Sequence, residues 1–208
     1  MIKTILTPVN AYKVYTFTAD EAYTQLPEAD LYVPEFRQDG NALTHIKTET
    51  AWGKYLIGCI STWNTKHPIA MQVSNAVHGV VGELMETYNE MKSNLSREEQ
   101  LSEIGDVLYY RTILCYLYGR DLNFNPSIDI DLYSCIALLS DVGKKAAFHD
   151  KIAHEKTISR LDSSMMLLDA LIVDLMSLLD LPLDEIMQYN LHKLNQRHSQ
   201  GKFNPNYT

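Results

Sequence analysis

Apolar residues recur at spacings of three and four along most of the chain after residue 48, which is the period of an α-helix with one buried face. The stretch 69–92 follows this spacing most clearly, with apolar positions at Val73, Ala76, Val77, Val80, Val81, Leu84 and Met85. The same pattern predicts helices over 48–64, 69–92, 97–119, 132–151, 160–180 and 182–199. We expect an all-α fold, a bundle of about five or six helices joined by short connections.

Turn and cap residues mark the ends of these predicted helices. Ser96 followed by Glu99 is the sequence of a capping box and predicts a helix start at residue 97. Gly119 suits the position just after a helix, where a left-handed backbone is common. The residue before Pro68 avoids the α conformation, which ends the first helix, and Pro182 suits the first turn of the last.

The N-terminal 48 residues carry a weaker pattern than the rest. Residues 13–19 alternate and are rich in β-branched and aromatic side chains, which is typical of a short strand. We therefore expect an irregular or β-containing extension over 1–48, an all-α domain over 49–203 and a tail over 204–208.

The helical region also suggests an internal repeat. HGVVGELME (78–86) can be aligned with IALLSDVGK (136–144), and each is followed by a loop and another apolar helix, which suggests repeats over 55–120 and 132–198, although any two amphipathic helices can be aligned. In such an alignment Asp141 and Lys144 stand where the first half has Glu83 and Glu86. The second half would then be a degenerate copy of the first.

Composition narrows the classes of function. The formal charge of −8 argues against a nucleic-acid or anionic-membrane surface, since both need clustered Lys and Arg. Three cysteines, odd in number and set far apart among apolar residues, fit reduced thiols in a cytoplasmic protein. The N-terminus has no apolar run typical of a signal peptide. The most apolar stretch, 165–181, is interrupted by three aspartates, which predicts a buried helix rather than a membrane span.

Four acidic residues are the main candidates for chemistry. Glu83 and Glu86, and likewise Glu103 and Asp106, are three residues apart, so each pair lies on one helix face. A solvated surface explains one such pair taken alone. Two pairs on consecutive, antiparallel helices can face each other, and four carboxylates repel unless a cation neutralises them. Ligand sets made only of oxygen favour Mg²⁺, with Mn²⁺ as the alternative, and suit a phosphorylated substrate.

Several words of the sequence, taken together and in order, resemble a known family. GELMETYNE (82–90) and EIGDVLYY (103–110) are similar to the paired acidic words of the all-α NTP pyrophosphatase superfamily, which includes the MazG-like and dimeric dUTPase-like proteins. NLHKLNQR (190–197), with GKF (201–203) after it, is similar to the closing signature of that family. KKAAFH (144–149) is similar to its lysine-rich segment, although here it lies beyond an extra helix.

The resemblance implies a MazG-like bundle that hydrolyses a nucleoside triphosphate between its α and β phosphates. The implied metal ligands are Glu83, Glu86, Glu103 and Asp106, and we name Glu86 and Glu103 as catalytic, with Glu86 the candidate base. The implied phosphate-binding residues are Lys144, Lys145, Asn190, Lys193 and Arg197. For the base of the nucleotide we name Asn75, Tyr109 and Trp63, for which a solvated asparagine and aromatic core packing are the alternatives.

We therefore expect a cytoplasmic, Mg²⁺-dependent nucleoside triphosphate pyrophosphohydrolase that serves nucleotide-pool sanitation or supply. A narrower alternative is an enzyme specific for dUTP or dCTP. The alternative from another class is a non-catalytic helical regulatory protein that binds nucleotide or metal. We expect no nucleic-acid or membrane partner, and a homodimer, with a higher homo-oligomer as the other option.

Overall fold

The computed structural model describes residues 3–6, 13–16, 50–90, 95–149 and 154–197. Within these residues the fold is a bundle of six helices, which confirms the predicted all-α class. The helices are α1 (Ala51–Thr62), α2 (Ile69–Glu90), α3 (Arg97–Tyr118), α4 (Leu132–His149), α5 (Glu155–Leu179) and α6 (Leu183–Arg197). Two short strands, β1 (Lys3–Leu6) and β2 (Lys13–Thr16), pair antiparallel, with Lys3 opposite Thr16.

The predicted caps of α3 are present at both ends. The Ser96 backbone N–H donates to Glu99 Oε2 at 2.8 Å, and the Glu99 N–H donates back to Ser96 Oγ at 3.3 Å. This reciprocal pair satisfies two backbone donors that the helix itself leaves unpaired. Gly119 ends the helix in the left-handed conformation, with φ of 61°, which costs glycine nothing because it has no Cβ.

The predicted start of α5 at residue 160 is wrong, because the helix begins at Glu155. His154 occupies the N-cap, and its Nδ1 accepts from the Lys156 backbone N–H at 3.3 Å. Histidine is not among the usual N-cap residues. The first turn also buries Thr157 and Ile158, so packing compensates for a stretch whose sequence looks polar.

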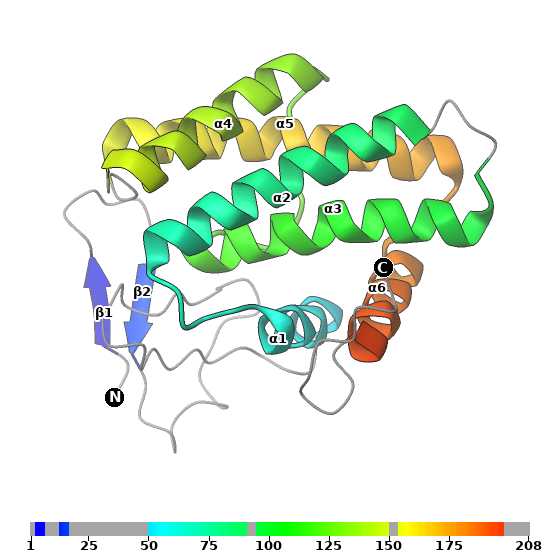
Figure 1. The fold of residues 1–208 in the computed structure, drawn as a ribbon, viewed down its shortest axis with the longest axis horizontal. Coiled ribbons are helices and arrows are strands. Elements are labelled where there is room, and N and C mark those ends of the chain that lie inside the picture. The colour runs from blue at the N-terminus through cyan, green and yellow to red at the C-terminus, as the bar shows by residue number, and fades with distance from the viewer. Residues whose placement is uncertain (1–2, 7–12, 17–49, 91–94, 150–153, 198–208) are drawn as a thin grey trace.

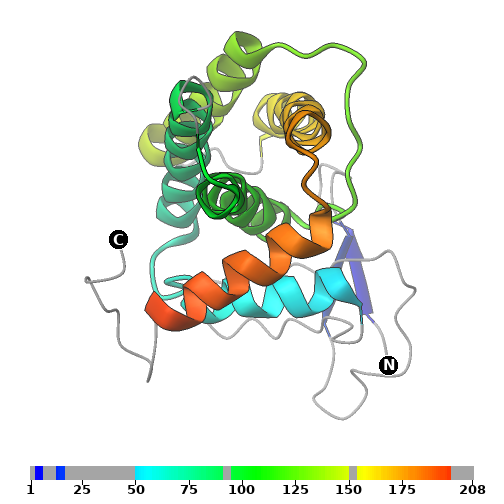
Figure 2. The same cartoon turned by 90° about the vertical axis from the view of Figure 1, so that its right-hand side faces the viewer.

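The helices form two groups around α3. α2 packs against both α3 and α4, and α4 packs against α5. On the other side, α1 and α6 lie against each other and both contact α3 (Figures 1 and 2). The core takes buried apolar side chains from every helix, for example Leu56, Val80, Leu108, Leu139, Leu168 and Ile186.

A buried ion pair fastens α3 to α5. Arg111 Nε donates to Asp169 Oδ1 at 2.8 Å, and Arg111 is 1% exposed. The guanidinium also donates to the carbonyl of Leu122 at 2.6 Å and lies over the rings of Trp52 and Phe124. Because a buried charge is tolerated only when it is paired and hydrogen-bonded, these contacts explain an aspartate inside the most apolar stretch of the chain.

The apolar stretch is thus part of a buried helix, as predicted. No described helix has the length and apolar character that crossing a bilayer requires. The three cysteines are buried and unpaired in the structure.

Candidate metal centre and adjoining pocket

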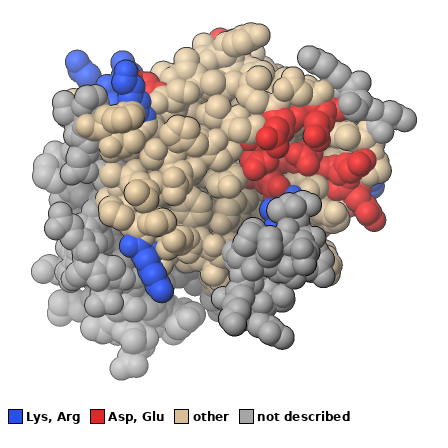
Figure 3. All heavy atoms as spheres, viewed as in Figure 1, with Lys and Arg blue, Asp and Glu red and all other residues tan. Residues whose placement is uncertain are grey.

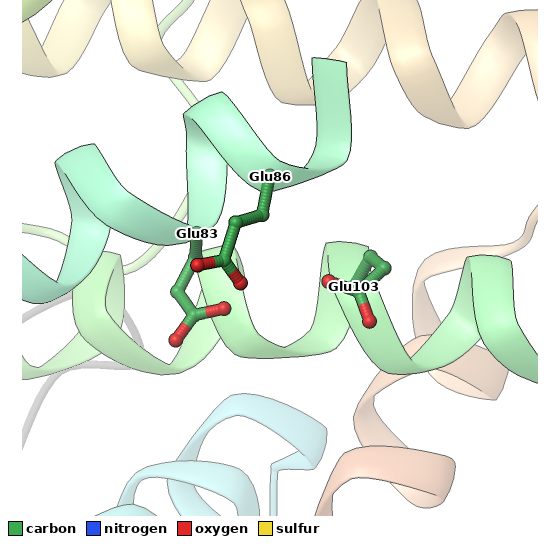
Figure 4. A group of neighbouring side chains, drawn as sticks. All are labelled: Glu83, Glu86 and Glu103. Carbon is green, nitrogen blue, oxygen red and sulfur yellow. The ribbon is translucent and has the colours of Figure 1, made fainter. Parts of the chain in front are cut away.

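Three of the four predicted metal ligands meet between α2 and α3. One carboxylate oxygen from each of Glu83, Glu86 and Glu103 lies within 4.8 Å of the other two. Figure 4 shows Glu83 and Glu86 extending from α2 towards α3, with Glu103 beside them on α3. Acidic side chains gather on this part of the molecular surface (Figure 3). Three oxygen donors at this spacing fit a hard divalent cation.

Burial and mutual repulsion disfavour three negative charges here. Burial raises the pKa of Glu83 to about 7, and the charges of Asp106, Glu86 and Glu103 add to this effect. The pKa of Glu103 is also raised, first by burial and then by Glu90 and Asp106. The positive charge of Lys193 acts in the opposite direction on both groups. The cluster therefore favours either a proton or a bound cation.

Asp106, the fourth predicted ligand, lies beside the three-acid group and is held by α6. It forms an ion pair with Lys193, whose Nζ also donates to Ser102 Oγ at 2.6 Å. Asp106 Oδ1 accepts a hydrogen bond from Asn190 Nδ2 at 3.1 Å. Asn190 Oδ1 in turn accepts one from the Tyr55 hydroxyl at 2.8 Å. Asn190 and Tyr55 have no exposed surface. A hydrogen-bonded chain thus runs from α1 through α6 to α3.

Two glycines allow α6 to come this close. A Cβ on Gly105 would lie 3.0 Å from the Asn190 side chain, and a Cβ on Gly58 would clash with Leu191. Adjacent residues of α6 therefore occupy space that side chains on α3 and α1 would otherwise fill. The sequence shows Gly105 between the two acids of α3, but it does not indicate that Asn190 packs against this glycine.

The predicted phosphate-binding lysines lie in two separate places in the structure. Lys193 reaches the acids, whereas Lys145 lies on α4, with Nζ 3.6 Å from Asp141 Oδ2. Asp141 also pairs with Arg160 of α5, and Lys144 is exposed. Among the interactions of the described residues, none joins either α4 lysine to the four acids. Asp141, which the suggested repeat aligns with Glu83, is therefore paired with cations of α4 and α5.

A cavity of about 390 Å³ reaches α2 and α3 about one helical turn from the acids, because its lining includes Gly79, four residues before Glu83, and Tyr110, four residues after Asp106. It is lined by Trp63, Asn64, His67, Asn75, His78, Gly79 and Tyr110. Two of the three residues predicted to bind a base, Trp63 and Asn75, are in this lining. Tyr109 is instead buried, with its hydroxyl 3.2 Å from Thr62 Oγ1.

Tyr110 occupies the place that the sequence suggested for Tyr109. Its ring lies where a side chain on Gly79 would be, and it packs edge-to-face against Trp63. Burial raises its pKa, and the charges of Glu83 and Asp106 raise it further, whereas Arg197 lowers it. Tyr110 therefore lines the cavity and also senses the charges of Glu83, Asp106 and Arg197, the last of which is a predicted phosphate-binding residue.

The wall of the cavity is fixed by hydrogen bonds. The indole N–H of Trp63 donates to Gln72 Oε1 at 2.9 Å. The amide of Gln72, which is buried in α2, donates to the carbonyl of His67 at 2.7 Å. These bonds hold the segment between α1 and α2 against α2. Because the only polar atom of the indole is already bonded, Trp63 offers the cavity an apolar ring surface.

The chain matches no family model, and comparisons with curated proteins and with solved structures gave no match. The family resemblance therefore rests on the sequence words alone and stays a prediction.

Proposed function

We propose that this protein is a Mg²⁺-dependent nucleoside triphosphate pyrophosphohydrolase, which converts an NTP or dNTP and water to the monophosphate and pyrophosphate. The observation that carries the proposal is the three-carboxylate group of α2 and α3, one helical turn along α2 from a cavity with aromatic and amide walls. Mg²⁺ prefers a few carboxylates together with substrate phosphate oxygens. A triphosphate at the acids with its base in the cavity satisfies both halves of this arrangement.

Glu83, Glu86 and Glu103 would hold the metal, with Asp106 next to them. Bound Mg²⁺ would supply charge neutralisation for the phosphates and a more acidic water. Glu86 has an exposed side chain and is our candidate for the base that accepts the proton of the attacking water. Lys193, which pairs with Asp106, and Arg197, whose charge lowers the pKa of Tyr110, are the candidates for offsetting negative charge on the phosphates.

The cavity is suited to a planar heterocycle. Trp63 and Tyr110 provide ring surfaces for stacking, which is worth about 1–3 kcal/mol per base in other proteins. Asn64, Asn75 and His78 provide donors and acceptors for the edge of a base. Both purine and pyrimidine bases offer such edges, so the choice between a broad enzyme and one specific for dUTP or dCTP is left to a substrate panel.

The test measures pyrophosphate release from the common NTPs and dNTPs with Mg²⁺ and, separately, with a chelator. Glu103→Gln should lower kcat/KM by about 100-fold or more, because it removes one charged ligand of the metal. Glu155→Gln is the matched control, since Glu155 is exposed in the first turn of α5, and it should leave kcat/KM unchanged.

Two results would contradict the proposal in different ways. Absence of pyrophosphate release from every nucleotide would overturn the enzyme and favour the non-catalytic binding protein. Undiminished release by Glu103→Gln would overturn the assignment of the metal site. We further expect the protein to be cytoplasmic and to form a homodimer. Measurement of its size in solution checks the oligomeric state.

A further inference from the structure

We propose that Tyr55 and Asn190 are positioning residues, which fix the carboxylate of Asp106 for the metal site. The inference rests on the proposed function, because it assigns these two residues a task in the same site. It differs from the expectation drawn from the sequence, in which Asn190 contacts the phosphates.

Burial decides between the two tasks for Asn190. Its side chain has no exposed surface and lies between Tyr55 and Asp106. A phosphate group therefore has no path to the amide in this conformation. Asn190 can act on the site only through the carboxylate to which it donates.

The hydrogen bonds leave the amide of Asn190 one favourable orientation. The ionised carboxylate of Asp106 accepts hydrogen bonds and cannot donate them, so Nδ2 must face Asp106 Oδ1, where it lies at 3.1 Å. Oδ1 then faces the hydroxyl of Tyr55, which donates to it at 2.8 Å. The hydroxyl oxygen is also 3.5 Å from the carbonyl oxygen of Gly105, the residue before Asp106.

The two oxygens of Asp106 have different partners on the same helix. Oδ1 accepts from Asn190, and Oδ2 pairs with Lys193, one turn further along α6. Lys193 is held in turn by Ser102. Donors at these two points fix the plane of the carboxylate, so α6 sets the orientation of Asp106. Lys193 serves the same purpose and adds positive charge.

Outer partners of metal ligands usually affect affinity strongly, and their loss typically costs 10-fold to 100-fold. Tyr55→Phe removes a single hydroxyl and keeps the ring. Without that hydroxyl the amide of Asn190 loses the bond that orients it, and of the two contacts that fix Asp106 only the one with Lys193 stays defined. We therefore expect metal binding to weaken by about 10-fold or more.

The experiment titrates Mn²⁺ into the full chain and follows free Mn²⁺ by electron paramagnetic resonance. Tyr55→Phe should weaken binding, whereas the control Tyr118→Phe should bind as the wild type does. Tyr118 is also fully buried and lies at the C-terminal end of α3. Thermal unfolding of each variant, in the absence of metal, shows that the titrations are made on folded protein.

A second variant separates positioning from general stability. Tyr55→Phe combined with Asn190→Leu removes both buried polar partners, and such paired replacement can be nearly neutral for stability. Positioning predicts that stability recovers towards the wild-type value while Mn²⁺ affinity stays weak. Recovery of affinity together with stability would overturn the inference.

The remaining outcomes distinguish the inference from the proposed function. If the wild type binds Mn²⁺ and Tyr55→Phe binds it equally well, positioning is overturned and the proposed function stands. If the wild type binds no Mn²⁺ or Mg²⁺, the proposed function is overturned, and positioning is overturned with it.

Discussion

Replacing Glu83 by glutamine should stabilise the metal-free protein at alkaline pH. Burial and the neighbouring acids raise the pKa of Glu83 from 4.5 to about 7 in the folded state. The folded protein therefore binds more protons than the unfolded chain between these pH values. In that window the free energy of unfolding falls as the pH rises. The favourable contribution is complete below about pH 4.5 and is lost above about pH 7.

The structure sets the size of the effect. A change from 4.5 to about 7 corresponds to about 3 kcal/mol if it is expressed fully. Glu83 is only half-buried, so solvent screens part of the repulsion, and we expect about 1–2 kcal/mol. For a chain of this size that is a difference of about 2–8 °C in Tm.

The assay compares thermal unfolding of the wild type and Glu83→Gln from pH 5 to pH 8 with a chelator present. The stability of the variant relative to the wild type should rise from pH 5 to about pH 7 and then level off. Glu155→Gln, at an exposed position of α5, should differ from the wild type by a constant amount over this range. Mg²⁺ should stabilise the wild type at pH 8 more than it stabilises Glu83→Gln. A difference between wild type and Glu83→Gln that does not depend on pH would refute the reasoning.

Two further predictions concern packing and the buried ion pair. Gly105→Ala places a methyl group 3.0 Å from Asn190 and should lower the free energy of unfolding by about 1–3 kcal/mol. Gly82→Ala has no atom within 4 Å of the new methyl group and should raise the free energy of unfolding by about 0.5–1 kcal/mol. Urea denaturation measures both, and equal effects would contradict the proposed close approach. Asp169→Asn leaves the charge of Arg111 buried without its partner and should cost about 3–5 kcal/mol in the same assay; a cost below about 1 kcal/mol would show that Arg111 is solvated.

The sequence was informative wherever the signal was local. Ser96 and Gly119 defined the ends of α3 because capping depends on residues within one turn. Glu83 and Glu86 were found in the same way, since their spacing puts them on one helix face. The start of α5 was missed because His154 caps it through an unusual residue type, and buried contacts stabilise its first turn.

The rest of the site depends on contacts between distant segments. Tyr55 and Asp106 are connected through Asn190, and no spacing in the sequence shows that these three residues meet. Tyr109 and Tyr110 are adjacent and chemically alike, so only the rotation of α3 decides which one is buried and which lines the cavity. That rotation is set by packing of the whole bundle rather than by local pattern.

Gly58 and Gly105 give α6 a defined register as well as a close approach. Leu191 lies at the first glycine and Asn190 at the second, so two neighbouring side chains are seated on two different helices. A shift of one residue along α6 would turn each side chain by about 100° and remove both from their places. The two glycines therefore select one register of α6. In that register both side chains fit, and Lys193 also reaches Asp106.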